Sequence, residues 1–155
     1  MSKKPDFDHS AAHKYFSTNC FNQAWDLIEK TDRTPAEDED MIRLSLASHY
    51  HWTQREDYSD SSASIAYWQT SHIYAVLGQA DNARRYGQLC LDVSQSEEIP
   101  PFFLGYAYEA LARAESTAGN QKQAQAYIDQ ARSVAEKIQE AEDKEQLLND
   151  LSTIT

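Results

Sequence analysis

Three histidines in the first half of the chain are the side chains best suited to bind a metal or to transfer protons. They are His49, His51 and His72. Residues two apart on a helix point about 200° from each other, so His49 and His51 cannot both bind one ion. Helical metal pairs prefer a spacing of three or four, and no HExxH or CxxC sequence accompanies these histidines. We therefore expect no metal and no cofactor. The alternative is a small metal-dependent or acid–base enzyme that uses His51 or His72 with nearby carboxylates.

The remaining reactive side chains form no catalytic pattern. Cys20 and Cys90 fall within predicted helices, and we expect both to be buried, reduced thiols. No serine or cysteine occupies the strand-to-helix turn that activates a nucleophile, and no glycine-rich phosphate loop is present. Carboxylates are abundant on solvated helix faces, where an ion pair contributes only a few tenths of a kcal/mol. The sequence therefore predicts no catalytic residue and favours a protein that is not an enzyme.

Composition and charge narrow the classes of partner. The chain has 155 residues, 41% of them hydrophobic, and carries a formal net charge of -11. Nucleic acid and anionic membranes both require clustered Lys and Arg, which an acidic chain does not supply. No apolar run approaches the roughly 20 residues that span a bilayer, and the N-terminal residues lack the apolar core of a secretion signal. We expect a single cytoplasmic domain over residues 1–155, with a flexible tail at 1–7.

Apolar periodicity predicts seven helices and no strands. Their approximate bounds are 9–30, 34–54, 62–77, 80–96, 100–118, 122–139 and 143–153. The second of these helices has a recognisable start at Thr34, Pro35 and Glu37. The side chains of Thr34 and Glu37 can each accept a hydrogen bond from the other's backbone amide, and Pro35 stands where a missing N–H costs nothing. Gly78 and Gly119 each follow a helix and are suited to end it.

Two stretches of the chain repeat one another at a distance of 41 residues. The matching pairs are Ala66 and Ala107, Tyr67 and Tyr108, Gly78 and Gly119, Ala83 and Ala124, Tyr86 and Tyr127, and Val93 and Val134. Each copy reads as a helix, a turn that contains glycine, and a second helix. A fixed period of this size is typical of stacked helical hairpins, each of which buries its apolar face on the next.

The spacing within each copy resembles the tetratricopeptide repeat. That family has an aromatic residue at position four, small residues at eight and twenty, and glycine near fifteen. The matching residues here are Tyr67, Ser71, Gly78 and Ala83 in one copy, and Tyr108, Ala112, Gly119, Ala124 and Ala131 in the other. The period is 41 rather than 34, which lengthens each helix by about one turn. Through 25–28 and 48–52 the chain also looks like bacterial tetratricopeptide-like proteins of unassigned function.

This resemblance implies an all-α, right-handed stack of three antiparallel hairpins. The first hairpin, at 8–55, fits the two-helix plan but not the motif. Residues 62–96 and 100–139 form the two repeat units, and a helix within 141–155 caps the stack. Capping helices need one polar side, which the charged residues of this last segment provide.

The family's concave groove supplies the candidate binding site. By resemblance it is lined by Trp68, His72, Tyr106, Glu109 and Arg113, which implies a protein or peptide partner. We expect the joint replacement of Trp68 and Arg113 to weaken binding and to leave thermal stability nearly unchanged. Two alternatives stay open: Trp68 and His72 pack against the first hairpin, or the outer hairpins form a homodimer.

Overall fold

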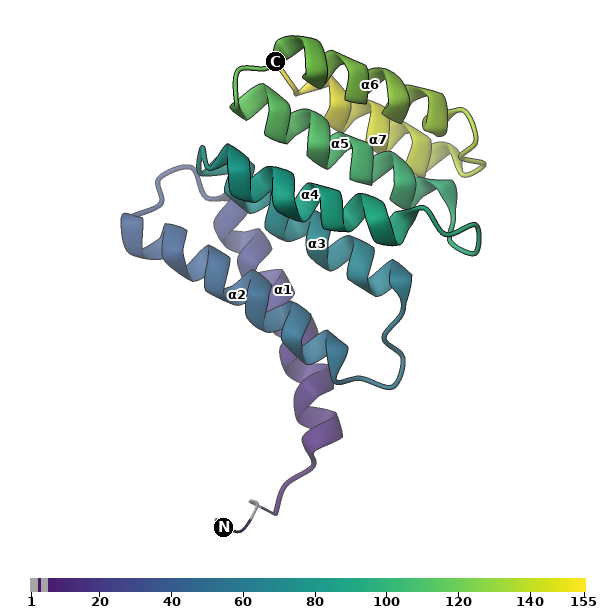
Figure 1. The fold of residues 1–155 in the computed structure, drawn as a ribbon. Helices are drawn as coiled ribbons and strands as arrows, with labels where there is room; N and C mark the ends of the chain where they lie inside the picture. Colours follow the sequence, from purple (N-terminus) through teal and green to yellow (C-terminus); the bar gives the residue numbers. More distant parts are fainter. Residues whose placement is uncertain (1–2, 4–5) are drawn as a thin grey trace. The chain divides into compact units, whose positions relative to one another are not determined.

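All regular structure in the described part of the chain is helical, which confirms the predicted all-α class (Figure 1). The computed structural model describes residues 3 and 6–155. The helices there are α1 (His9–Glu29), α2 (Pro35–Thr53), α3 (Asp60–Val76), α4 (Ala80–Ser94), α5 (Pro101–Thr117), α6 (Gln121–Ala135) and α7 (Ala141–Ser152). Among these residues no helix is both long and apolar enough to cross a membrane.

The chain divides into two compact units at Tyr58. The first unit, Met1–Tyr58, contains α1 and α2, which pack against each other. The second unit, Ser59–Thr155, contains α3 to α7. The boundary falls in the polar connection that the sequence places between its first hairpin and its first repeat unit.

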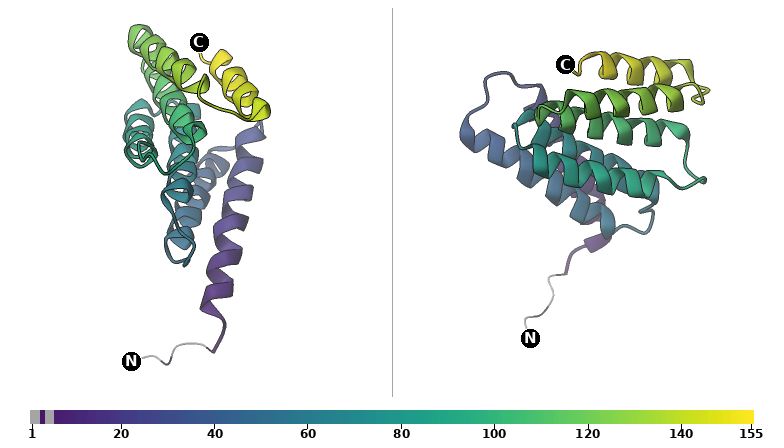
Figure 2. Two further views of the ribbon diagram at one scale, coloured as in Figure 1. Left: turned by 90° about the vertical axis from the view of Figure 1, so that its right-hand side faces the viewer. Right: turned by 45° about the horizontal axis from the view of Figure 1, so that its top comes forward.

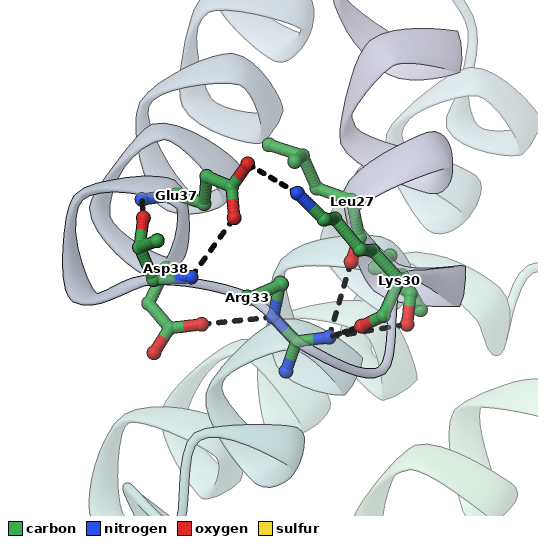
Figure 3. A network of polar contacts seen from close by, with 7 residues as sticks. Leu27, Lys30, Arg33, Glu37 and Asp38 are labelled. Atoms are coloured by element: carbon green, nitrogen blue, oxygen red, sulfur yellow. Dashed lines mark hydrogen bonds and ion pairs between the residues drawn. The ribbon is translucent and has the colours of Figure 1, made fainter.

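A polar network in the first unit joins the end of α1 to the start of α2 (Figure 3). Thr34 accepts from the Glu37 amide at 3.2 Å, and Glu37 accepts from the Thr34 amide at 2.9 Å, so the predicted cap of α2 is confirmed. Arg33 donates from Nη1 to the carbonyls of Leu27 and Lys30, at 3.1 Å and 2.6 Å. Its Nε donates to Asp38 at 2.8 Å. One arginine thus satisfies carbonyls left open at the end of α1 and binds the first turn of α2.

Small residues let α1 and α2 approach closely. Ser17 and Ala24 are buried on α1, and Met41 and Ser48 are buried on α2. The Ser48 hydroxyl donates to the Ser17 carbonyl at 2.6 Å, so this buried polar group is paired. The core between the two helices is thin because Met41 is its only large, fully buried apolar side chain among the described residues of this unit.

In the second unit, α3–α4 and α5–α6 are two hairpins of the same construction. α3 and α5 each have 17 residues, and α4 and α6 each have 15. Gly78 and Gly119 take φ angles of +74° and +81°, a conformation that glycine adopts without steric cost. In both turns the glycine amide bonds to the carbonyl three residues back, and the next amide bonds five residues back. The predicted helix-ending glycines are confirmed.

The hairpins also share their internal packing. Ala83 and Ala124 are buried at matching positions early in α4 and α6. The rings of Tyr67 and Tyr86 lie 6.3 Å apart, as do those of their counterparts Tyr108 and Tyr127. Small residues where the helices approach and tyrosines beside them are the features that the repeat pattern predicted.

An ion pair and a close contact join the two hairpins. α4 lies beside α5 (Figure 1). Arg84 of α4 donates from Nε to Glu115 of α5 at 2.5 Å, and Asn120 donates to the same carboxylate at 2.8 Å. The neighbouring Arg84 guanidinium lowers the pKa of Glu115. Gly87 faces Leu111, which a Cβ on Gly87 would meet at 3.0 Å.

The C-terminal helix α7 packs on α5 and α6 (Figure 2). Its Leu147 and Leu151 are buried in a cluster with Ile138. α6 ends at Ala135, so its predicted extent to 139 is wrong: the Ile138 amide turns back to the Ala135 carbonyl, which places Ile138 in the cluster. Gly105 of α5 makes room for Leu147, whose Cδ2 lies 2.5 Å from the position of an added Cβ.

The two thiols differ in exposure. Cys90 is buried, and burial raises the pKa of its thiol to about 11. Cys20 is only partly buried, so the expectation that both thiols lie in the core is wrong for Cys20. Both cysteines are free.

Candidate functional site

The structure brings the five residues assigned to the groove into one network. Trp68 and His72 come from α3, and the other three come from α5. The Trp68 ring stacks on His72 with centroids 5.0 Å apart, and the edge of Tyr106 meets Trp68 at 5.6 Å. Burial lowers the pKa of His72 to about 4, aided by the positive charge of Arg113. His72 is therefore neutral at physiological pH.

Glu109 is the polar centre of this network. It is 0% exposed, and Trp68 Nε1 donates to its Oε2 at 2.7 Å. Arg113 Nε donates to its Oε1 at 2.9 Å. Burial raises the pKa of Glu109, and the opposing effects of Arg113 and Trp68 are smaller. Trp68 and Glu109 occupy equivalent positions of the two repeat copies, so their bond joins matching points of the two hairpins.

The same network holds α7. The Tyr106 hydroxyl donates to Asp150 at 2.6 Å. Arg113 Nη2 donates to the Asp150 carbonyl at 3.2 Å and to the Thr153 hydroxyl at 2.8 Å. These contacts give Tyr106, Glu109 and Arg113 a structural role, so we now expect the joint replacement of Trp68 and Arg113 to lower stability rather than to leave it nearly unchanged. Binding of a partner by the five residues stays a prediction.

A second candidate surface lies on the first unit and was missed from the sequence. Tyr15 and Phe16 of α1 are 59% and 43% exposed, and Leu46 and Tyr50 of α2 are 40% and 59% exposed. The ring centroids of Tyr15 and Phe16 are 5.1 Å apart. The His51 ring lies between the two helices' aromatic residues, with its centroid 5.3 Å from that of Phe16 and 5.5 Å from that of Tyr50. We call Tyr15, Phe16 and Tyr50, together with Leu46 four residues before Tyr50 on α2, the aromatic face. Exposed large apolar side chains that gather in this way mark interaction sites.

A hollow continues from the aromatic face along the same two helices. It is lined by Gln23, Asp26, Leu27, Asp40, Arg43, Leu44 and Ala47. Gln23 is seven residues from Phe16, and Arg43 is seven residues from Tyr50, a spacing that keeps them on one side of each helix. The stretch of α1 from Phe16 to Leu27 spans about 16 Å at 1.5 Å per residue. The surface thus has aromatic anchors at one end, and at the other Asp26 and an ion pair at 2.6 Å between Asp40 and Arg43.

Two histidines meet at the aromatic end. His13 Nδ1 and His51 Nδ1 lie 2.8 Å apart, with ring centroids at 5.0 Å. His49 instead bonds to the Tyr58 hydroxyl at 2.8 Å through Nε2. The sequence does not show that His13 lies beside His51, because 38 residues separate them and only the pairing of α1 with α2 brings them together. Within the described residues no group of three or more His, Cys, Asp or Glu is placed to hold a metal ion.

Comparisons with known proteins give no relative. No family model matches the chain, and no match was found among curated proteins or among solved structures. The resemblance to the tetratricopeptide repeat stays a prediction that depends on the residues and hairpins described above.

Proposed function

We propose that this chain is a non-enzymatic module that binds a protein or peptide on the aromatic face of its α1–α2 hairpin. The observation that carries the proposal is the exposure of the four large apolar side chains of the aromatic face on helices α1 and α2. A thin helical pair gains little from exposed aromatic rings, whereas burial of a Tyr or Phe against a partner is a main source of binding energy.

We further propose that the second unit is a short stack of tetratricopeptide-like hairpins that serves as the scaffold. The matching helix lengths, glycine turns and tyrosine pairs of α3–α4 and α5–α6 support this reading. The bond from Trp68 to Glu109 supports it as well, because stacked repeats bring equivalent positions into contact. The right-handed sense of the stack stays a prediction.

The surface indicates the chemistry of its partner. Apolar side chains of a partner suit the rings of Tyr15, Phe16 and Tyr50. Beyond them the hollow is lined by Asp26 and by Asp40, which is paired with Arg43. With a net charge of -11, the chain attracts basic segments over a distance. The partner we expect is a segment of about three helical turns, apolar at one end and carrying Lys or Arg at the other.

Affinity capture from a lysate of the source cells tests the proposal. The test variant carries Tyr15→Ala and Tyr50→Ala, and the matched control carries Ile65→Ala and Val76→Ala, which remove exposed apolar side chains from the second unit. We expect the test variant to lose the proteins that the wild type captures and the control to retain them. Equal capture by both variants would remove the aromatic face as the binding site.

Two further experiments distinguish this proposal from a homodimer and from binding in the groove assigned by resemblance. Light scattering on the purified wild type detects a homodimer, and a dimer that Tyr15→Ala and Tyr50→Ala dissociate would make a second copy of this chain the partner. Trp68→Ala tests the groove assigned by resemblance. If Trp68→Ala alone abolishes capture while the aromatic-face variant binds normally, the site lies on α3 and α5.

A further inference from the structure

The two facing imidazole nitrogens of the first unit have a separation close to that of two ligands of one metal ion. His13 extends from α1 and His51 from α2, and their Nδ1 atoms are 2.8 Å apart. Metal–nitrogen bonds of about 2.0–2.1 Å place two ligands at right angles about 2.9 Å apart, and tetrahedral ligands about 3.3 Å apart. The pair is therefore close enough to bind one ion once each ring turns its Nδ1 lone pair from the other ring toward the metal.

A third imidazole lies one turn away on the same helix. His9 and His13 are four residues apart on α1, the spacing at which two histidines of one helix bind a common ion. The His9 ring now lies against Phe7, with centroids 4.4 Å apart. His9 begins α1 and is exposed, so rotation of its side chain toward His13 requires no rearrangement of a core. Two imidazoles thus lie side by side, and the third joins them only when the His9 side chain turns away from Phe7.

We propose that His13 and His51, with His9 as the third ligand, bind a late first-row divalent ion, Cu²⁺ or Ni²⁺, at the aromatic end of the α1–α2 hairpin. Imidazole nitrogens suit both ions, and nitrogen sites generally bind Cu²⁺ more tightly than the other divalent first-row ions. Bound metal replaces the hydrogen bond between the two Nδ1 atoms and joins α1 to α2. Each ring then keeps its proton on Nε2.

The site lies beside the aromatic face but does not depend on the proposed partner. A metal that links α1 to α2 stabilises the hairpin that presents Tyr50 and Phe16. The inference can be tested on the purified chain alone, so it can fail while protein binding is retained, and protein binding can fail while metal is bound.

Titration of the tag-free chain with Cu²⁺ against a competing chelator is the direct experiment. We expect one Cu²⁺ per chain, bound at least tenfold more weakly by His13→Ala and by His51→Ala. His9→Ala should weaken binding about threefold to tenfold, because it removes the ligand that is not yet in place. The matched control is His49→Gln, whose native imidazole bonds to Tyr58; it should bind Cu²⁺ as the wild type does.

A second variant and a second readout cover the case in which an alanine disturbs the fold. His13→Asn keeps a hydrogen-bonding group near His51 and removes the imidazole ligand. Electron paramagnetic resonance of the Cu²⁺ form should show nitrogen coupling from the bound rings, with one nitrogen fewer in His13→Asn. Unchanged Cu²⁺ affinity and unchanged nitrogen coupling in His13→Asn, or equal weakening by His49→Gln, would overturn the proposal.

Discussion

Removal of the Arg113 guanidinium should leave the buried Glu109 carboxylate without its charged partner. Arg113→Met keeps most of the aliphatic part of the side chain but removes the ion pair at 2.8 Å and the bonds to Asp150 and Thr153 on α7. Loss of one member of a buried pair costs about 3–5 kcal/mol, more than the few tenths expected for an exposed helical pair. We expect Arg113→Met to lower the free energy of unfolding of the second unit by at least about 3 kcal/mol at pH 8.

The loss should depend on pH in a direction set by Glu109. Its pKa in the folded chain lies above the ordinary value of 4.5, because burial outweighs the opposing effect of Arg113. Between the unfolded and folded pKa values the folded chain binds more protons than the unfolded chain, so this carboxyl lowers stability as pH rises. Without Arg113 the folded pKa rises further. Arg113→Met should therefore lower the free energy of unfolding by less at pH 5 than at pH 8.

Urea denaturation at pH 5 and pH 8 measures both effects. Glu109→Gln combined with Arg113→Met removes the unpaired charge, so the double variant should recover much of the loss and show no pH-dependent deficit from this site. A deficit below about 1 kcal/mol for Arg113→Met at pH 8, or one that does not change with pH, would refute the reasoning that Glu109 is a buried charge held by Arg113.

Substitutions at four positions test the packing, turns and cap of the other elements by urea denaturation. Gly105→Ala places a Cβ 2.5 Å from Leu147 and should lower the free energy of unfolding by about 1–3 kcal/mol. The loss should be smaller in a Leu147→Ala background, and additive losses would contradict the contact. Gly78→Ala and Gly119→Ala should each cost about 1–2 kcal/mol and nearly the same amount, since both glycines have positive φ in equivalent turns; unequal costs would argue against equivalent hairpins. Thr34→Ala should cost about 1 kcal/mol while Thr34→Ser retains the cap, and equal loss in both would exclude the cap as the cause.

Local signals in the sequence were enough to predict the helices and the two repeated turns. Thr34 and Glu37 interact within one turn, and Gly78 and Gly119 act on the residues just before them, so the relevant information lies within a few positions. The end of α6 was wrong because it is decided by a distant contact: Ile138 leaves the helix to pack with residues of α7. No local pattern distinguishes that turn from one more turn of helix.

The candidate sites depend on contacts that the sequence does not display. The repeat period of 41 relates Trp68 to Glu109, but the hydrogen bond between them appears only when α3 and α5 lie side by side. The spacing of four between His9 and His13 is visible in the sequence and marks them as a possible pair, but it gives no sign of His51. Exposure of Tyr15 and Tyr50 could not be found from spacing, because aromatic residues on a helical stripe more often form a core.

A photo-crosslinking side chain in place of Tyr50 tests the central claim most directly. The same group in place of Val76, which is also exposed but lies on α3, is the control. Irradiation in the source cells should give a discrete crosslinked protein at Tyr50 and none at Val76, which identifies the partner and its site together. No adduct at Tyr50, or the same adduct at both positions, would contradict binding on the aromatic face.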